Sequence, residues 1–349
     1  MDGIRPVASR PRPAPPVTGP TRNRIEPGRL PSVSILPTEV VTGAAGFLGS
    51  NLVDFLLEHK RTVVGIDNLS TGKLRNLADA RKSPRFRFQR ADLVRLQRLP
   101  RADRYYHLAS AASPPAYQQD PVGTLLANAT GTQHVLEAAR RHDARALIAS
   151  TSEVYGDPEV HPQNERYWGH VNPVGVRSCY DEGKRYAEAL AAAYRRRYGL
   201  DVRIARIFNT YGPRMDPNDG RVIPNFIVQG LRGRPFTVYG SGRQSRSFCF
   251  VADLVEGLSR LMEAPSGTPT PMNLGNPREL TMLQTARLVA RELGISPRFA
   301  FRPLPKDDPE RRCPDIRLAR RVLGWSPGIP LEQGLPPTVA YFRSLAQPG

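Results

Sequence analysis

Three evenly spaced glycines near the start of the chain constrain its fold more than any other feature. Gly43, Gly46 and Gly49 follow a short strand-like run, residues 39–42, and precede the helical run SNLVDFLLEHK. In a strand–turn–helix unit, glycines let the backbone approach a pyrophosphate closely, and the helix N-terminus faces its negative charge. Ordinary turns use glycine too, but this context predicts a dinucleotide-binding unit that opens an alternating α/β fold.

An acidic residue follows at the spacing expected for a carboxylate that binds a ribose. The run TVVGIDN predicts a second strand that ends at Asp67, 24 residues beyond Gly43. A carboxylate there would repel a 2′-phosphate, so NAD is favoured over NADP. The alternative is a turn residue at a strand end, because Asp-Asn followed by Ser-Thr-Gly suits a turn.

Strand and helix patterns continue to alternate after this unit. RFRFQRADL predicts a strand with Asp92 at its end, RYYHLAS a strand that leads into the loop 110–117, and ARALIAST a strand that delivers Thr151. A long helix is expected over residues 121–142, between the last two strands. Ligands of open parallel sheets bind at the carboxyl edge of the strands, so these strand ends should meet the glycine turn in one cleft.

These patterns predict an α/β fold: a doubly wound parallel sheet of the Rossmann type with a smaller C-terminal α/β substrate-binding lobe. The sheet domain should take residues 37–212, with segments near 248–262 returning to it, and the lobe mainly residues 213–349. The expected cofactor-binding residues are Gly43, Gly46, Phe47, Leu48, Gly49, Asp67, Asn68, Asp92, Leu93, Leu108, Ser110, Tyr180 and Lys184.

A tyrosine and a lysine four positions apart form the candidate proton acceptor. Tyr180 and Lys184 lie in the helical run YDEGKRYAEALAAAY, which puts both side chains on one helix face. Lowering a tyrosine pKa from about 10 toward 7 takes roughly 4 kcal/mol, which a lysine ammonium and an oxidised nicotinamide together would supply. We therefore expect a phenol that works as a base near neutral pH. The spacing also occurs by chance in many helices, and it gains weight only from the dinucleotide unit upstream.

The charge of the chain limits the classes of partner. The formal net charge is +18 at pH 7, but the basic residues are scattered, which suits a solvated surface and an acidic substrate better than nucleic acid. Residues 1–36 hold six arginines against two acids and are rich in proline, which predicts a disordered tail rather than a signal peptide. A transmembrane helix needs about 18 consecutive apolar residues, and no stretch of the sequence approaches that length.

The cysteines and histidines give no metal pattern. Cys179, Cys249 and Cys313 lie far apart, and a sparse, odd count suits a reducing compartment. The six histidines form no cluster in the sequence. We therefore expect no structural or catalytic metal.

Several longer segments carry the most specific patterns of the chain. They are TSEVYGDPEVHPQ, YWGHVNP, RSCYDEGKRYAE, RIFNTYGPRM, NDGRVIPNF, TVYGSGRQSRSF and DDPERRCPDI. From about residue 40 to about residue 343 the chain resembles the extended short-chain dehydrogenase/reductase family, and within it the UDP-glucuronate decarboxylases. The resemblance implies NAD as cofactor, UDP-glucuronate as substrate and UDP-xylose as product, formed through a UDP-4-keto intermediate with NAD regenerated. It also implies a homodimer built on residues 121–142 and 180–198, in a cytoplasmic form without a membrane anchor.

The same resemblance implies roles for individual residues. Thr151 and Tyr180 would act at the C4 hydroxyl of the sugar, while Glu153 and Arg312 would act near its carboxylate, with Ser152 as a further contact. The alternative for Glu153 is a partner for a structural arginine, and the alternative for Arg312 is a surface charge in the run ERR. The expected catalytic residues are Thr151, Ser152, Glu153, Tyr180, Lys184 and Arg312, and the further substrate-binding residues are Tyr117, Asn209, Arg221, Asn225 and Arg246.

The sequence departs from the family pattern at Leu126 and is compatible with four other functions. Leu126 stands where many members of the family carry a lysine that helps to hold the substrate. A decarboxylase that releases the UDP-4-keto-pentose and NADH, a nucleotide-sugar 4-epimerase, a 4,6-dehydratase and a non-catalytic NAD-sensing interaction protein would share most of these motifs. A 4,6-dehydratase would need an acid beside the catalytic hydroxyl, where this chain has Ser152.

Overall fold

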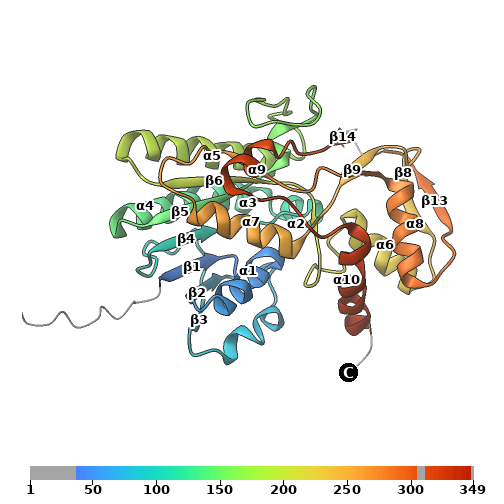
Figure 1. Cartoon of the computed structure of the whole chain (residues 1–349), viewed down its shortest axis with the longest axis horizontal. Helices are drawn as coiled ribbons and strands as arrows, with labels where there is room; N and C mark the ends of the chain where they lie inside the picture. The colour runs from blue at the N-terminus through green and yellow to red at the C-terminus, as the bar shows by residue number, and fades with distance from the viewer. Residues whose placement is uncertain (1–36, 305–310, 347–349) are drawn as a thin grey trace, which may run out of the picture. The chain divides into compact units, whose positions relative to one another are not determined.

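A seven-stranded parallel sheet forms the centre of the fold (Figure 1). The computed structural model describes residues 37–304 and 311–346. The strands run in the order β11-β6-β5-β4-β1-β2-β3. The first six places from the other edge, 3-2-1-4-5-6, are the order of a doubly wound sheet, so the predicted fold class is confirmed. The strands are β1 (Thr38–Thr42), β2 (Thr62–Asp67), β3 (Phe86–Arg90), β4 (Arg104–His107), β5 (Arg145–Thr151), β6 (Val202–Ile207) and β11 (Met272–Leu274).

Two apolar clusters cover the two faces of this sheet. Neighbouring residues of a strand point to opposite faces, and in β1 Val41 joins one cluster while Val40 joins the other. The cluster around Val41 contains side chains of α1 (Phe47–Glu58) and α7 (Val251–Glu263). The cluster around Val40 contains side chains of α4 (Thr132–His142) and α5 (Ser178–Tyr198). The sheet is therefore buried on both sides, as parallel sheets require.

The expected long helix over residues 121–142 is present, but it contains a wider turn that the sequence did not predict. It consists of α3 (Pro121–Leu126), a π-helical turn (Ala127–Gly131) and α4. Within the widened turn, the amide of Asn128 donates to the carbonyl of Thr124 at 2.9 Å and to the hydroxyl of Ser110 at 3.0 Å. Single π turns in helices often accompany functional sites, and this one ties the helix to the loop after β4.

The later part of the chain contributes strands of three small sheets and further helices. The sheets pair β10 with β7, β9 with β12 and β14, and β13 with β8. Their strands are β7 (Thr210–Tyr211), β8 (Phe236–Tyr239), β9 (Ser245–Ser247), β10 (Cys249–Phe250), β12 (Glu279–Thr281), β13 (Phe299–Arg302) and β14 (Arg311–Arg312). The remaining α-helices of the described part are α2 (Pro114–Gln119), α6 (Val222–Leu231), α8 (Met282–Leu293), α9 (Arg317–Leu323) and α10 (Leu331–Ala346). Figure 1 shows β8, β13, α6, α8 and α10 together to the right of the large sheet.

The chain returns to the large sheet after residue 213. Helix α7 packs on α1 and β6, and β11 adds the seventh strand beside β6. The return of β11 was not foreseen from the sequence, because its three residues are too few for a periodic pattern. The division of domains at residue 212 stays a prediction, and the predicted disordered tail, residues 1–36, lies outside the described residues. Among the described helices, none has the length and apolar character that crossing a membrane requires.

Candidate active site

A cavity of about 1410 Å³ opens at the carboxyl edge of the large sheet. The ends of β1, β2, β5 and β6 all reach it, as the doubly wound topology requires. Every site residue singled out from the sequence lines this cavity: Gly43, Gly46, Phe47, Leu48, Gly49, Asp67, Asn68, Asp92, Leu93, Leu108, Ser110, Tyr117, Thr151, Ser152, Glu153, Tyr180, Lys184, Asn209, Arg221, Asn225, Arg246 and Arg312.

The glycine turn leaves no space for side chains. Gly43 has a positive φ of 72°, and a Cβ there would lie 2.8 Å from the carbonyl carbon of Leu108. A Cβ on Gly49 would lie 2.0 Å from the carbonyl oxygen of Gly43. Helix α1 begins after Gly46 with no side-chain cap, so its first N–H groups keep their hydrogen-bonding capacity beside the cavity. This turn can cradle a phosphate group.

Asp67 lies at the end of β2 beside the glycine turn. Its carboxylate accepts hydrogen bonds from the N–H groups of Ala45 at 2.9 Å and Leu69 at 2.7 Å. Burial raises the pKa of Asp67, and these two N–H donors oppose the rise. The turn interpretation and the ribose interpretation of Asp67 are therefore compatible, because the bond to Leu69 closes the turn while the side chain still lines the cavity. Asp92 likewise closes its own turn by accepting from the N–H of Val94 at 2.9 Å.

Lys184 and Tyr180 occupy one face of α5, close to Thr151. The ammonium of Lys184 donates to the carbonyl of Ala149 at 2.7 Å and lies 5.8 Å from the centre of the Tyr180 ring. Burial lowers the pKa of Lys184 to about 8. Burial also raises the pKa of Tyr180 to about 12, and the negative charge of Glu153 adds to this rise. A hydrogen bond from Thr151 acts in the opposite direction and lowers the pKa. Loss of hydration is the largest influence on this pKa in the protein alone, and the expected lowering by Lys184 together with an oxidised nicotinamide stays a prediction.

Tyr117 packs face to face on Tyr180. The two ring centroids are 5.0 Å apart and the ring planes differ by 3°. The hydroxyl of Tyr117 is buried and has no hydrogen-bond partner among residues 37–304 and 311–346. The stack fixes the position of the Tyr180 ring and leaves one buried hydroxyl that a ligand could satisfy.

Glu153 and Arg312 form a buried ion pair that joins the helical turn Ser152–Tyr155 to β14. One guanidinium nitrogen of Arg312 lies 2.6 Å from the Glu153 carboxylate and 3.2 Å from the Ser152 hydroxyl. The other donates to the carbonyl of Gly156 at 2.8 Å. Arg312 is only 2% exposed, which excludes the surface-charge alternative. The Nε of Arg312 is buried without a partner in the described part of the chain.

A second arginine on the same carboxylate was missed in the sequence. Arg177, at the start of α5, also pairs with Glu153. Burial opposes ionisation of Glu153, yet Arg312, Arg177 and Arg246 together lower the pKa of its carboxyl. Glu153 therefore does pair with arginines, as the structural alternative proposed, but within the cavity. The position of Arg177 three residues before Tyr180 is the only signal in the sequence, and a charged residue there is usually a solvated helix end.

Asp181 is the other ionisable group that sequence reasoning missed. It is 6% exposed and lies 3.9 Å from Arg177. Its Oδ1 is buried without a hydrogen-bond partner among the described residues. Burial, together with the charge of Glu153, raises the pKa of Asp181 to about 7.

The expected substrate contacts lie on the C-terminal side of the cavity. Arg246 on β9 pairs in register with Arg312 on β14. Arg221 is held by the carboxylate of Asp219. The side chain of Asn225 donates to the carbonyl of Gly220 at 2.9 Å, and the carbonyl of Asn209 accepts from the N–H of Cys249 at 2.9 Å. This side of the cavity therefore presents several cations, which suits an acidic, phosphorylated ligand.

Leu126 also lines the cavity, at 43% exposure, so the departure from the family pattern falls in the site itself.

Outside the cavity, His161, Glu279 and Cys313 lie close enough together to hold a metal ion. Burial raises the pKa of the Cys313 thiol to about 12, which works against a thiolate ligand. The expectation of no metal stays a prediction.

Comparison with known proteins places these features in a family context. The model of the NAD dependent epimerase/dehydratase family matches residues 40–275. UDP-glucuronic acid decarboxylase 1 of Xenopus tropicalis is 52% identical over 304 residues, which cover 87% of this chain and 72% of that protein. UDP-glucuronic acid decarboxylase 2 of Arabidopsis thaliana is 53% identical over 304 residues, which cover 87% of this chain and 68% of that protein.

A solved relative supports the same fold at lower identity. The UDP-glucuronic acid 4-epimerase of Bacillus cereus, crystallised with UDP-glucuronic acid and NAD, superposes with a TM-score of 0.80 at 28% identity. The match covers 88% of this chain and 99% of that chain. The decarboxylases are therefore much more similar in sequence than this epimerase of the same fold.

Proposed function

Because the chain belongs to the NAD dependent epimerase/dehydratase family, we propose that it converts UDP-glucuronate into UDP-xylose and CO2 with regeneration of NAD. Relatives with about half of their residues identical over most of the chain carry this activity in their names. The observation that carries the proposal is the buried Arg312–Glu153 pair in the same cavity as Tyr180 and Lys184. A 4-epimerase that acts on a neutral UDP-hexose has little use for such a pair, because its sugar carries no carboxylate at C5.

The glycine turn and Asp67 would hold NAD. The space that a Cβ on Gly43 or Gly49 would need is filled by backbone, so only glycine permits the close approach of a pyrophosphate. The buried carboxylate of Asp67 suits ribose hydroxyls and disfavours a 2′-phosphate. When bound, NAD would supply reversible oxidation at C4 of the sugar.

Tyr180 would take the proton from the C4 hydroxyl, with Thr151 orienting that oxygen. A hydrogen bond from Thr151 lowers the pKa of Tyr180 against the larger effect of burial. A further positive charge at the ring would bring the phenol closer to the range of a working base. Lys184, held by the carbonyl of Ala149, keeps a donor beside the ring throughout the cycle.

Arg312 would position the carboxylate that leaves. Its terminal nitrogens donate to Glu153, Ser152 and Gly156, which leaves the buried Nε and one further terminal N–H as donors for the substrate. A ketone at C4 stands beta to the carboxylate, so the C5–carboxylate bond can break to give CO2 and a C4 enolate. The hydroxyls of Tyr180 and Thr151 would stabilise that enolate oxygen. The negative charge of Glu153 favours departure of the carboxylate as neutral CO2.

The cycle closes when C5 gains a proton and C4 is reduced to the alcohol. Water held by Arg312 would supply the C5 proton, since the guanidinium group does not give up its own proton in proteins. An enzyme that stopped before the reduction would release the UDP-4-keto-pentose and NADH. This remains the second candidate, because the same residues serve both outcomes.

Product analysis by NMR after mixing the protein with UDP-glucuronate and NAD tests the proposal. UDP-xylose with no net gain in NADH absorbance is the expected result. Steady NADH accumulation with a 4-keto product would select the second candidate instead. Recovery of unchanged UDP-glucuronate, with turnover of a neutral UDP-hexose, would reject decarboxylation altogether. NAD binding without turnover of either sugar would favour an NAD-sensing interaction protein.

Dimerisation, location and the domain boundary belong to the proposal as well. Exposed apolar side chains on the neighbouring helices α3 and α5, including Val122, Leu125 and Tyr186, support a homodimer through these helices. Light scattering coupled to size-exclusion chromatography would give the mass in solution, and a monomeric mass would exclude the homodimer.

Cell fractionation would test the expected cytoplasmic location. Limited proteolysis near residue 212 would test the division into a sheet domain and a substrate lobe.

A further inference from the structure

A second cavity, of about 580 Å³, lies behind the wall of the active site. The wall is the small sheet β12-β9-β14. Ser245 on β9 and Arg311 on β14 pair in register and line the second cavity. The next residues, Arg246 and Arg312, also pair in register and line the active site. Successive residues of a strand point to opposite faces, so Ser245 and Arg311 leave the sheet on the face opposite to Arg246 and Arg312. Gln244, just before β9, lines both cavities, which are therefore adjacent.

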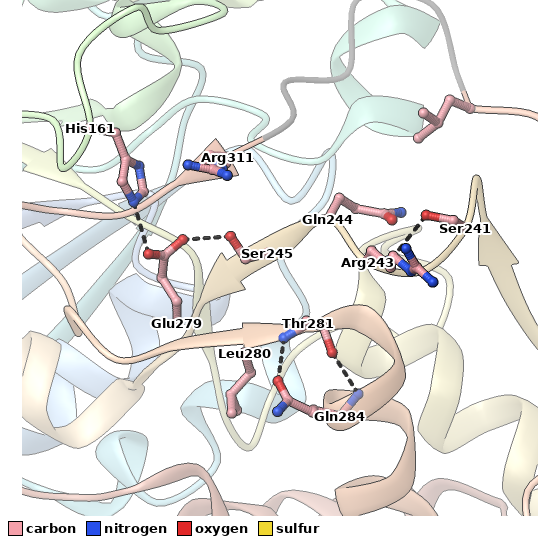
Figure 2. Close-up of a pocket in the computed structure, with 11 residues that line it drawn as sticks. His161, Ser241, Arg243, Gln244, Ser245, Glu279, Leu280, Thr281, Gln284 and Arg311 are labelled. Atoms are coloured by element: carbon pink, nitrogen blue, oxygen red, sulfur yellow. Dashed lines mark hydrogen bonds and ion pairs between the residues drawn. The ribbon is translucent and has the colours of Figure 1, made fainter.

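Two arginine side chains that line the second cavity, Arg243 and Arg311, form no ion pair or side-chain hydrogen bond with the residues that the structure describes. Figure 2 shows Arg311 coming from β14 and Arg243 from the turn before β9. Within the part of the chain that the structure describes, neither guanidinium forms an ion pair or hydrogen bond, since only the backbone N–H of Arg243 donates, to Ser241. Both side chains are exposed at the mouth of the cavity. Arginines without partners in a concave site favour an anionic ligand.

Among the residues that the structure describes, Glu279 is the one carboxylate that lines this cavity, and its hydrogen-bonding needs are met. Glu279 accepts from His161 at 2.9 Å and from the hydroxyl of Ser245 at 2.5 Å, as Figure 2 shows. It therefore does not neutralise the arginines. A divalent cation on the nearby His161, Glu279 and Cys313 cluster would be disfavoured by Arg311, and burial raises the pKa of the Cys313 thiol to about 12.

The start of α8 supplies no free donors to the same cavity. The capping box between Thr281 and Gln284 satisfies one backbone N–H at each residue. The next two N–H groups, of Met282 and Leu283, donate to the backbone carbonyls of Gln244 and Gly242 in the turn before β9. The strong donors that remain are the guanidinium groups of Arg243 and Arg311. Each presents a planar fork that matches two oxygens of a phosphate.

We propose that this second cavity binds the diphosphate group of a small molecule, with Arg243 and Arg311 as the two phosphate ligands. Two forks suit two linked phosphates better than one isolated phosphate or a monocarboxylate. The volume falls within the roughly 300–1,000 Å³ of ordinary small-molecule sites, and Leu280 and Leu304 add apolar lining. Free pyrophosphate and a nucleoside diphosphate share this chemistry, and they differ in whether the apolar lining is used.

Calorimetric titration of the full chain with pyrophosphate tests the site. The double variant R243Q/R311Q should lose one binding event or bind it at least about tenfold more weakly than the parent protein. The variant R287Q/R291Q removes the same charge from exposed positions of α8 outside the cavity, and it should bind as the parent does. Thermal unfolding of both variants checks that they fold. Equal stoichiometry and affinity in R243Q/R311Q and the parent would overturn the proposal.

A second titration separates this site from the active site. In R246Q, which alters the active-site face of β9, the event assigned to Arg243 and Arg311 should persist. If R246Q abolished that event while R243Q/R311Q kept it, the anion would bind only in the active site and the inference would be wrong. Repeating the R246Q titration with UDP distinguishes the sources: tighter binding than pyrophosphate indicates a nucleotide, and weaker binding indicates the free diphosphate. The outcome does not depend on whether the protein decarboxylates UDP-glucuronate.

Discussion

The guanidinium of Arg312 lies 2.6 Å from the carboxylate of Glu153, although 159 positions separate the two residues in the chain. The contact joins the strand end that delivers Thr151 to the C-terminal strand β14, and it shares its carboxylate with Arg177. Two arginines on one buried carboxylate leave a net positive site. That site can receive the carboxylate of an acidic sugar without leaving a buried charge unpaired.

Replacing Arg312 should impair both chemistry and stability. Arg312→Ala removes one of the two arginines that pair with Glu153 and leaves Arg177, so the loss of unfolding free energy should stay below the about 3–5 kcal/mol of an unpaired buried charge. Arg312→Lys keeps the charge but not the fork, so it should fold better than the alanine variant while turnover stays low. Urea unfolding and the rate of UDP-xylose formation measure the two effects. Arg320→Ala, an exposed arginine on α9, is the control, and equal kinetics in Arg312→Lys and the parent would contradict the assigned role.

Tyr180→Phe should abolish most turnover and leave NAD binding intact. The substitution keeps the ring that stacks on Tyr117 and removes only the hydroxyl, so the site should stay assembled. Loss of a general base lowers turnover by about 10²–10⁴-fold. Calorimetry with NAD and product NMR make the comparison. Tyr186→Phe, on the same helix but half exposed, should behave as the parent, and substantial activity in Tyr180→Phe would point to another base.

Gly49→Ala should destabilise the glycine turn and weaken NAD binding. Its new methyl group would lie 2.0 Å from the carbonyl oxygen of Gly43, so the backbone must move. Such overpacking costs about 1–3 kcal/mol of unfolding free energy. Gly46→Ala should cost less, because its Cβ would meet the same oxygen at 3.2 Å. Unfolding midpoints of the two variants rank the effects, and an unchanged midpoint for Gly49→Ala would show that the turn tolerates the shift.

Asp181 should make stability fall as the pH rises through the weakly acidic range. Its pKa in the folded protein, about 7, lies above the 3.8 of a free aspartate, so the folded state binds an extra proton between these two pH values. The stability that this proton contributes is fully present below about pH 4 and is lost as the pH passes about 7. Asp181→Asn should remove this dependence and should be the more stable protein above pH 7. Thermal unfolding of both proteins from pH 5 to 8 measures it, and parallel curves would refute the assignment.

Leu126→Lys should strengthen binding of UDP-glucuronate. Leu126 lines the cavity at 43% exposure, where an ammonium would attract the phosphates and the carboxylate of the substrate. We expect a severalfold lower KM with little change in kcat. Leu125→Lys adds the same charge to a neighbouring position, 41% exposed but outside the cavity, and should leave KM unchanged. A KM that moves equally in both variants would mean long-range attraction rather than a local contact.

Sequence reasoning reached the fold and the residues that line the cavity because their signals are local. The spacing of Gly43, Gly46 and Gly49 reflects a single turn, and the spacing of Tyr180 and Lys184 reflects a single helix face. The order of strand ends then brings them to one edge of the sheet. Leu126 was identified in the same way, as a departure within a short motif.

The sequence by itself determined the doubly wound fold and the glycine turn, since periodicity and turn chemistry act over a few positions. Its resemblance to a family indicated the residues on the substrate side of the cavity. Only the tertiary structure decided which of those groups touch: Arg177 joining Arg312 on Glu153, Tyr117 stacking on Tyr180, and Arg311 turned away from Arg312 into a second cavity. It also decided the electrostatics, since burial raises the pKa of Tyr180 to about 12. Side-chain contacts and pKa values depend on burial and on segments far apart in the chain, so the spacing of a motif does not predict them.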